Sequence, residues 1–231
     1  MGSDIRPDDP RSIREMFERL APDYDRLNTA LTFGMVRGWR RALVREARLA
    51  PGGQVVDVCT GTGQTLAEVA GAVGPGGLAV GVDFTPGMLR RARGRLVLAD
   101  ALALPLPDGA FDAAVSAFAL RDVADQRAML REMVRVTRPG GRVGILEIGR
   151  PRSLPLRVGF DAWFRGAVPR IAAAVGHGES HRFLVRSLAF LPQPEELAGW
   201  MRDEGLTEVG WRELSLGTAR LFVGSRGGPG G

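Results

Sequence analysis

The stretch that most constrains the fold is VVDVCTGTGQTLAEVA, residues 55–70. A β-branched run carries Asp57, glycines follow at Gly61 and Gly63, and an Ala/Leu/Val segment with helical spacing comes next. This order predicts a buried strand, a tight turn and then a helix over 64–73. Glycines in such a turn let the backbone approach a ligand closely, so a binding site is expected here.

From residue 53 onward, short apolar runs alternate with helical ones. This alternation is typical of βαβ units, which build a parallel sheet covered by helices on both faces. The last two runs are spaced like an antiparallel hairpin at the sheet edge. The sequence therefore predicts an α/β fold with a seven-stranded, mostly parallel sheet. The expected strands are 54–58, 78–83, 95–100, 111–120, 142–149, 207–214 and 217–225, and the expected helices around them are 64–73, 86–95, 125–141 and 194–204.

The chain is expected to divide into three parts. Residues 1–50 form an N-terminal helical lid region, and residues 51–226 form the main domain. An insertion near 152–192 is expected to cover the substrate, and the glycine-rich end, 227–231, to be disordered. The helices of the lid region are expected at 11–21, 24–32 and 36–48.

Composition excludes several classes of protein. All 31 basic residues are arginine, and they are interleaved with 26 acidic residues to a net charge of +5. This is typical of a mixed solvated surface, so no nucleic-acid partner is expected. No apolar run approaches the ~20 residues of a membrane span, and the polar N-terminus shows no signal-peptide core. Cys59 is the only cysteine, so neither disulfides nor a cysteine zinc site is expected, and a cytoplasmic location is favoured.

The glycine turn separates two classes of cofactor. A dinucleotide fingerprint needs a third glycine where Leu66 stands, so the turn favours S-adenosylmethionine over NAD. Asp57 would offset the sulfonium or ammonium charge, and Thr62 would offer its hydroxyl and amide groups to the methionine part.

Acids after the next two strands complete this cofactor site. Asp83 is placed to accept two ribose hydroxyls. Asp100 is placed to accept the adenine amino group, with the backbone amide of Ala101 on a ring nitrogen. The expected cofactor-binding residues are Asp57, Gly61, Thr62, Gly63, Asp83, Phe84, Asp100 and Ala101, to which a resemblance to a known family adds Ser116.

Several motifs together resemble a known family. DVCTGTG, PGML after Asp83, DALALPLPDGAFD, SAFALRDV and LREMVRVTRPGGRVGILEIGRP resemble class I S-adenosylmethionine-dependent methyltransferases. MFERLAPDYDRLN, FGMVRGWRR and VPRI are similar to the subfamily that C-methylates demethylmenaquinol and ubiquinone-precursor benzoquinols. The resemblance covers about residues 14–224. It implies a Rossmann-like fold and places Thr62, Asp83, Asp100-Ala101 and Ser116 on the cofactor contacts.

The resemblance implies transfer of a methyl group to a ring carbon of a prenylated quinol, from demethylmenaquinol type to menaquinol type, with S-adenosylhomocysteine as the other product. The alternative is another small aromatic or natural-product acceptor. Gln64 stands where the family usually has an acid, and Asp122 where it usually has asparagine. A nucleic-acid methyltransferase motif is lacking after the fourth strand, and a binding protein without turnover stays open.

The candidate catalytic residues are Arg121, Asp122, Tyr24 and His181. Arg121 would stabilise a phenolate, and Asp122 would orient the phenol or take its proton; the alternative is an ion pair that only fixes the loop. Tyr24 reaches the cofactor carboxylate or the acceptor, or only packs. His181 is a base or a surface residue. With His177 it has i, i+4 spacing but no third ligand, so no metal is expected.

Residues 154–176 are apolar with arginines at intervals. They suggest a lid over a prenyl tail, with Arg157, Arg165 and Arg170 meeting anionic head groups at the inner face of a membrane. The alternative is a core-facing crossover helix broken near Pro169. A homodimer is a further expectation.

Overall fold

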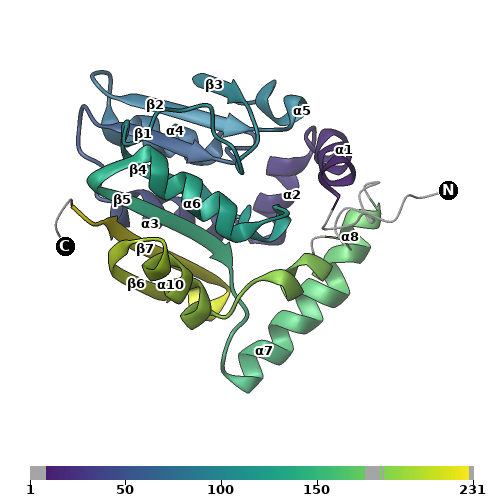
Figure 1. Cartoon of the computed structure of the whole chain (residues 1–231). Coiled ribbons are helices and arrows are strands. Elements are labelled where there is room, and N and C mark those ends of the chain that lie inside the picture. The colour runs from purple at the N-terminus through teal and green to yellow at the C-terminus, as the bar shows by residue number, and fades with distance from the viewer. Residues whose placement is uncertain (1–8, 175–182, 184, 229–231) are drawn as a thin grey trace.

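The computed structural model describes residues 9–174, 183 and 185–228. Its strands form a seven-stranded sheet in the order β3-β2-β1-β4-β5-β7-β6 (Figure 1). Strands β1 to β5 run parallel, whereas β7 pairs antiparallel with both β5 and β6. The predicted mostly parallel sheet with an antiparallel edge pair is therefore confirmed. The strands are β1 (Gln54–Val58), β2 (Leu78–Asp83), β3 (Arg95–Leu98), β4 (Phe111–Ala117), β5 (Thr137–Ile148), β6 (Leu206–Leu214) and β7 (Ala219–Arg226).

The strand order reverses between β1 and β4, because β1 pairs with β2 on one side and with β4 on the other. In open parallel sheets, ligands bind outside the carboxyl ends of the strands at such a reversal. The glycine turn that follows β1 lies at this point. The topology therefore places the residues after β1 to β4 around one edge of the sheet.

Helices cover both faces of the sheet, and each face has its own apolar core. Met133 of α6 and Met201 of α10 belong to one core, and Leu43 of α3 and Val69 of α4 belong to the other. Both cores are fully shielded from water, which fixes the strands between them. The helices are α1 (Pro10–Leu20), α2 (Tyr24–Leu31), α3 (Met35–Glu46), α4 (Gln64–Val73), α5 (Pro86–Leu89), α6 (Gln126–Val136), α7 (Leu154–Asp161), α8 (Val168–Ala174) and α10 (Pro194–Asp203), with shorter turns η1 (Leu120–Asp122), η3 (Leu188–Phe190) and η4 (Ser215–Gly217).

The helix predicted over 86–95 is wrong in its length, since α5 ends at Leu89. The chain then continues in tight turns, with the amide of Ala92 donating to the carbonyl of Leu89 at 3.1 Å. Gly94 takes a φ of +121° that starts the approach to β3. Ala92 lies against the glycine turn: a Cβ placed at Gly63 would sit 2.9 Å from the Ala92 Cβ.

The helix predicted over 125–141 also ends early, at Val136, and β5 begins at Thr137. The backbone is already extended at Thr137, with φ −80° and ψ 131°. Gly140 adopts a φ of +75°, and regular pairing with β4 resumes only at Arg142. The Pro-Gly-Gly segment therefore forms an irregular start to the strand, because proline cannot continue a helix.

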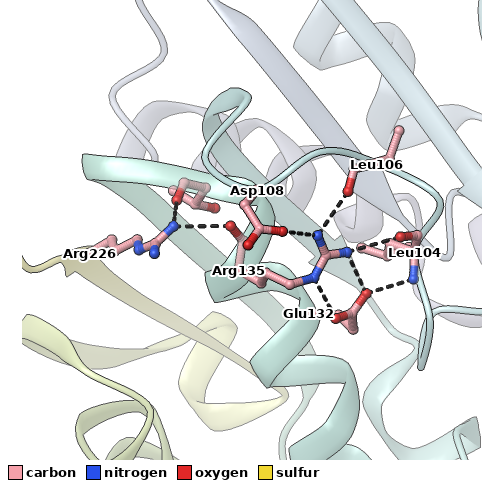
Figure 2. A network of polar contacts seen from close by, with 7 residues as sticks. Leu104, Leu106, Asp108, Glu132, Arg135 and Arg226 are labelled. Carbon is pink, nitrogen blue, oxygen red and sulfur yellow. Dashed lines mark hydrogen bonds and ion pairs between the residues drawn. The ribbon is translucent and has the colours of Figure 1, made fainter.

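The loop between β3 and β4 is fastened to α6 by Arg135 (Figure 2). The Arg135 guanidinium donates to the carbonyl groups of Leu106 at 2.8 Å and Leu104 at 2.9 Å, and to Asp108. Both Glu132 carboxylate oxygens accept from Arg135 at 2.7 Å, and one accepts the Leu104 amide at 2.6 Å. Charge-assisted bonds of this kind are the strong ones. They hold the segment that follows Asp100 in one conformation.

The segment after β5 is a long helical rod in which a π-helical stretch, η2 (Ala162–Ala167), joins α7 to α8. The rod is not broken near Pro169, but its α-helical hydrogen bonding is interrupted by the π-helical stretch just before that residue, so the predicted irregularity is present in a milder form. No residue of α7 is buried, so the core-facing alternative is wrong for this part. Figure 1 shows the rod extending away from the sheet. Among the described helices, none has both the length and the apolar character needed to cross a bilayer.

Candidate active site at the carboxyl ends of the strands

The glycine turn after β1 is held by Asp83 at the end of β2. The amide of Gly61 donates to Asp83 Oδ2 at 2.8 Å, and the amide of Thr85 donates to Oδ1 at 2.9 Å. Gly61 and Gly63 have φ values of +58° and +79°, in the region that favours glycine. Burial raises the pKa of Asp83, while these backbone donors oppose the shift. Asp83 thus fixes two turns and still lines the hollow beside them.

Two residues at strand ends have a left-handed backbone although they are not glycine. Cys59 after β1 has φ +58°, and Phe118 after β4 has φ +62°. Such conformations cost of order 1–3 kcal/mol and concentrate at ligand sites. Both residues line the same hollow. Among the described residues, two of the seven non-glycine positions with positive φ therefore lie where the fold is expected to bind its cofactor.

We call the two adjoining cavities above β1, β2 and β4 the cofactor hollow. They share Cys59, Asp83, Phe84, Asp122 and Val123 as lining residues. Of the residues expected to bind the cofactor, the hollow brings together Gly61, Asp83, Phe84, Asp100 and Ala101.

Four expected cofactor residues lie behind this surface and are not among its lining residues. Asp57 is buried and accepts from the Thr60 hydroxyl at 2.6 Å. Its pKa is raised to about 7 by burial, with Thr60 and Arg40 opposing the shift. Ser116 is also buried, and the cavity wall at this strand is made by Ala117 and its successors instead. The four residues are Asp57, Thr62, Gly63 and Ser116.

Helix α2 is tied to the glycine turn by Asp25, a residue that sequence reasoning missed. Asp25 accepts from the Thr62 hydroxyl at 2.6 Å and from the Gln64 side-chain amide at 2.9 Å. Thr62 therefore uses its hydroxyl on the protein itself. Gln64 departs from the family's usual acid, and here it supplies a donor that an acid would lack. The signal in the sequence was the acid beside Tyr24, but its partner lies 37 residues away.

Next to the cofactor hollow lies a second cavity, which we call the acceptor chamber. Its walls are mostly apolar and come from α2, the ends of β4 and β5, and the rod, and Arg121 is the charged residue among them. Tyr24 and Phe118 line both the chamber and the hollow. These two side chains therefore form the partition between the expected cofactor and acceptor positions.

Arg121 is buried and paired with acids. Its guanidinium donates to Glu147 at 3.0 Å and lies 3.7 Å from Asp122. Glu147 also accepts the amides of Leu120 at 2.7 Å and Ile148 at 3.2 Å, which fixes it in β5. Burial raises the pKa of Glu147 to about 7, and Arg121 opposes this shift. Glu147 was missed by sequence reasoning, although an acid inside an apolar strand was a signal for it.

The remaining catalytic candidates divide between the two cavities. Asp122 lines the cofactor hollow and Arg121 the acceptor chamber, although the two are adjacent in sequence. Burial raises the pKa of Asp122, and Arg121 opposes the shift. Burial likewise raises the pKa of Tyr24, against the nearby charges of Arg40 and Arg121. His181 and His177 lie outside the described residues, and the described part of the chain holds no group of acids, histidines and cysteines that could bind a metal.

Solved structures confirm the fold class. A Thermotoga maritima protein, described as an S-adenosylmethionine-dependent methyltransferase and possible histamine N-methyltransferase, superposes with a TM-score of 0.68. The superposition covers 93% of this chain and 99% of that one, at 20% identity. The [4+2]-cyclase SpnF superposes with a TM-score of 0.67 over 95% of this chain, at 17% identity. Likeness at this level of identity concerns the fold alone.

Sequence relatives are much closer. A demethylmenaquinone methyltransferase from Roseiflexus castenholzii is 43% identical over 224 residues, 94% of each chain. A demethylmenaquinone methyltransferase from Mycobacterium tuberculosis is 38% identical, over 95% of this chain and 94% of that one. A ubiquinone/menaquinone biosynthesis C-methyltransferase from Syntrophotalea carbinolica is 38% identical over the full length of both. The model of the ubiE/COQ5 methyltransferase family matches residues 6–226, and the chain therefore belongs to the ubiE/COQ5 methyltransferase family.

Proposed function

We propose that this enzyme transfers the methyl group of S-adenosylmethionine to a ring carbon of a demethylmenaquinol-type quinol. The observation that carries the proposal is the placement of Arg121 in an apolar chamber that shares a partition with the cofactor hollow. The names of the relatives at 38–43% identity support the choice of a quinol as acceptor.

The residues of the hollow fit S-adenosylmethionine. Asp83 and Asp100 offer carboxylates at the ends of neighbouring strands, where ribose hydroxyls and an adenine amino group need acceptors. Gly61 leaves the backbone open to close approach, because nothing lies within 4 Å of the position of its absent Cβ. S-Adenosylmethionine supplies a methyl group already activated by its sulfonium. The protein therefore has to align the acceptor, exclude water and manage one proton.

Arg121 and its neighbours meet the needs of the acceptor. A phenol ring carbon becomes a good nucleophile when the hydroxyl beside it loses its proton, and a buried guanidinium stabilises the resulting oxyanion. Glu147 holds Arg121 in place at 3.0 Å. Asp122 has a raised pKa, so its carboxylate is a stronger base than an exposed one. It lines the hollow and not the chamber, so it takes the proton through a water molecule. Tyr24 and Phe118 line both cavities, so they border the path of the methyl group from the hollow to the chamber.

An outer groove extends the acceptor chamber to the protein surface. It shares Leu31, Thr32, Ile148 and Phe164 with the chamber and is lined almost entirely by apolar side chains. On the rod beside it, Leu154 is 61% exposed and Val158 is 60% exposed. We therefore place the prenyl tail of the quinol in this groove and a peripheral membrane contact at α7. The expected homodimer and the location at the inner membrane face stay predictions.

The test is methyl transfer from labelled S-adenosylmethionine to chemically reduced demethylmenaquinone analogues. Wild type should methylate the ring, and Arg121→Met should lose about 100-fold or more in turnover, the size seen when an oxyanion donor is removed. Binding of S-adenosylhomocysteine by the variant should be retained, and Arg131→Met, an exposed arginine on α6, is the matched control. A strong loss of turnover in Asp122→Asn would identify the Asp122 carboxylate as the group that takes the proton. A wild-type protein that binds the cofactor and leaves every quinol unmodified would refute the quinol assignment and favour another aromatic acceptor.

A further inference from the structure

One buried charge in the described part of the chain has no acid hydrogen-bonded or ion-paired to it. Arg40, in the middle of α3, is only 8% exposed. Its Nε makes no hydrogen bond, and among the described residues no acid lies within ion-pair distance of its guanidinium. A buried charge without a partner is costly, and cores normally pair or neutralise it. Arg121 shows the usual solution, with Glu147 and Asp122 beside it.

Arg40 lies close to the cofactor hollow, although it is not among the residues that line the hollow or the acceptor chamber. Its Cζ is 5.8 Å from the centroid of the Phe118 ring, which belongs to the partition. Its charge lowers the pKa of Tyr24, the other partition residue, and that of Asp57 in β1. Helix α3 also packs on α4, the helix that starts directly after the glycine turn. The guanidinium is thus positioned behind the partition, on the side of the glycine turn.

Asp57 interacts electrostatically with Arg40 but balances its charge incompletely. The two side chains interact through space but form no ion pair. Asp57 Oδ2 is occupied by the Thr60 hydroxyl. The pKa of Asp57 is about 7, so near neutral pH its carboxyl is protonated in a large fraction of molecules. An anion supplied from outside the protein would complete the charge balance.

We propose that Arg40 binds the α-carboxylate of the methionine part of S-adenosylmethionine, an inference that rests on the proposed function for its ligand. The methionine part carries one carboxylate and one ammonium group. Asp25 is fastened to the glycine turn through Thr62 and Gln64 and presents a carboxylate on that side. A cationic side chain and an anionic one therefore come from neighbouring helices of the N-terminal region, which matches the two charges of the ligand.

The proposal is tested by pairing variants with truncated ligands. Calorimetry would measure binding of S-adenosylhomocysteine, of decarboxylated S-adenosylmethionine and of 5′-methylthioadenosine, which lacks both the carboxylate and the amino group. Arg40→Met should weaken the binding of S-adenosylhomocysteine by about 30-fold or more. This is the loss expected when one partner of a buried charge pair is truncated. Binding of the two ligands without a carboxylate should stay within about twofold of wild type. Arg45→Met, an exposed arginine on the same helix, is the control.

Two results would overturn the proposal. Equal weakening of all three ligands would mean that Arg40 only supports the fold, and unchanged binding of S-adenosylhomocysteine would mean that it does not touch the carboxylate. If Arg40→Met fails to fold, Arg40→Lys keeps the charge and must show a loss confined to the ligand with the carboxylate. A protein that shows this selective loss but methylates no quinol would leave Arg40 assigned while the proposed acceptor fails.

Discussion

The cofactor side and the acceptor side of this enzyme are built in different ways. On the cofactor side, Arg135 and Glu132 fasten the loop after Asp100 through a dense set of charge-assisted hydrogen bonds (Figure 2). On the acceptor side, the rod extends from the sheet (Figure 1). Its first helix, α7, has no buried residue and carries exposed apolar side chains. Polar bonds fix position and angle, whereas an exposed apolar face tolerates ligands of varied length.

This contrast matches the two ligands. S-Adenosylmethionine has a fixed shape and several polar groups, and it needs a rigid site with matched donors and acceptors. A prenylated quinol has a small polar head and a long apolar tail. On the acceptor side the structure gathers buried charged groups around Arg121. The outer groove is lined mostly by apolar side chains, with two tryptophan N–H groups bonded to Ser215 and to the carbonyl of Leu31.

The largest effect on stability is expected on the cofactor side. Arg135→Met should lower the free energy of unfolding by about 2–3 kcal/mol, because several carbonyl and carboxylate acceptors lose a charged donor at once. Denaturant unfolding would measure it, with Arg131→Met as the control one turn earlier on α6. An equal loss in both variants would show that the loop is not held by this network.

The next effect uses pH to compare the two sides. Burial raises the folded-state pKa of Glu147 from 4.5 to about 7, so the folded protein holds this proton more tightly than the unfolded chain. The contribution of Glu147 to the free energy of unfolding is therefore fully present below its unfolded pKa. It is lost as pH rises through 7, by about 2 kcal/mol between pH 5 and 7. Glu147→Gln should flatten this slope, measured by denaturant unfolding at each pH.

Glu15→Gln, which changes an exposed acid on α1, should leave the slope unchanged. Asp57 on the cofactor side also has a pKa of about 7. Asp57→Asn should therefore also reduce the fall in the free energy of unfolding as pH rises toward 7. A pH dependence that survives both substitutions would contradict the assignment to these two carboxyl groups.

A smaller effect is expected where α2 meets the glycine turn. Gln64→Glu places a second carboxylate against Asp25 and removes a donor, which should cost about 1 kcal/mol. Adding Asp25→Asn should recover part of that loss, because one of the two like charges is gone. Thermal unfolding of the single and double variants would measure the coupling. Additive losses would mean that Asp25 and Gln64 do not interact.

The smallest effect on stability is expected at α7. Replacing both Leu154 and Val158 by serine should change the free energy of unfolding by less than about 0.5 kcal/mol, because both side chains are exposed. The same double variant should bind less to anionic lipid vesicles in a flotation assay. Leu98→Ser, which removes an exposed apolar residue on β3, is the control. Unchanged vesicle binding would mean that α7 does not make the membrane contact.

Local sequence patterns predicted most of the fold. Periodicity identified the seven strands, and the glycine turn identified the reversal point of the sheet. The two wrong helix boundaries, after Leu89 and after Val136, fall where the chain must turn to enter a strand. Tertiary packing decides those positions, and a local pattern does not contain it.

The site was harder to predict because its contacts are long-range. Asp83, Asp100 and Arg121 follow strands, so topology alone brought them together. Asp25 and Glu147 act on partners 37 and 26 residues away, and no spacing rule links such pairs. Arg40 looked like any arginine of a helix in the sequence, and only its burial distinguishes it.

Helix α2 contributes to the walls of both cavities. Tyr24 lines the hollow and the chamber, and Asn28 and Leu31 line the chamber. The same helix is fastened to the glycine turn by Asp25. Because one short helix supplies walls to both cavities and is bonded to the glycine turn, a displacement of α2 would alter the cofactor site and the acceptor site together.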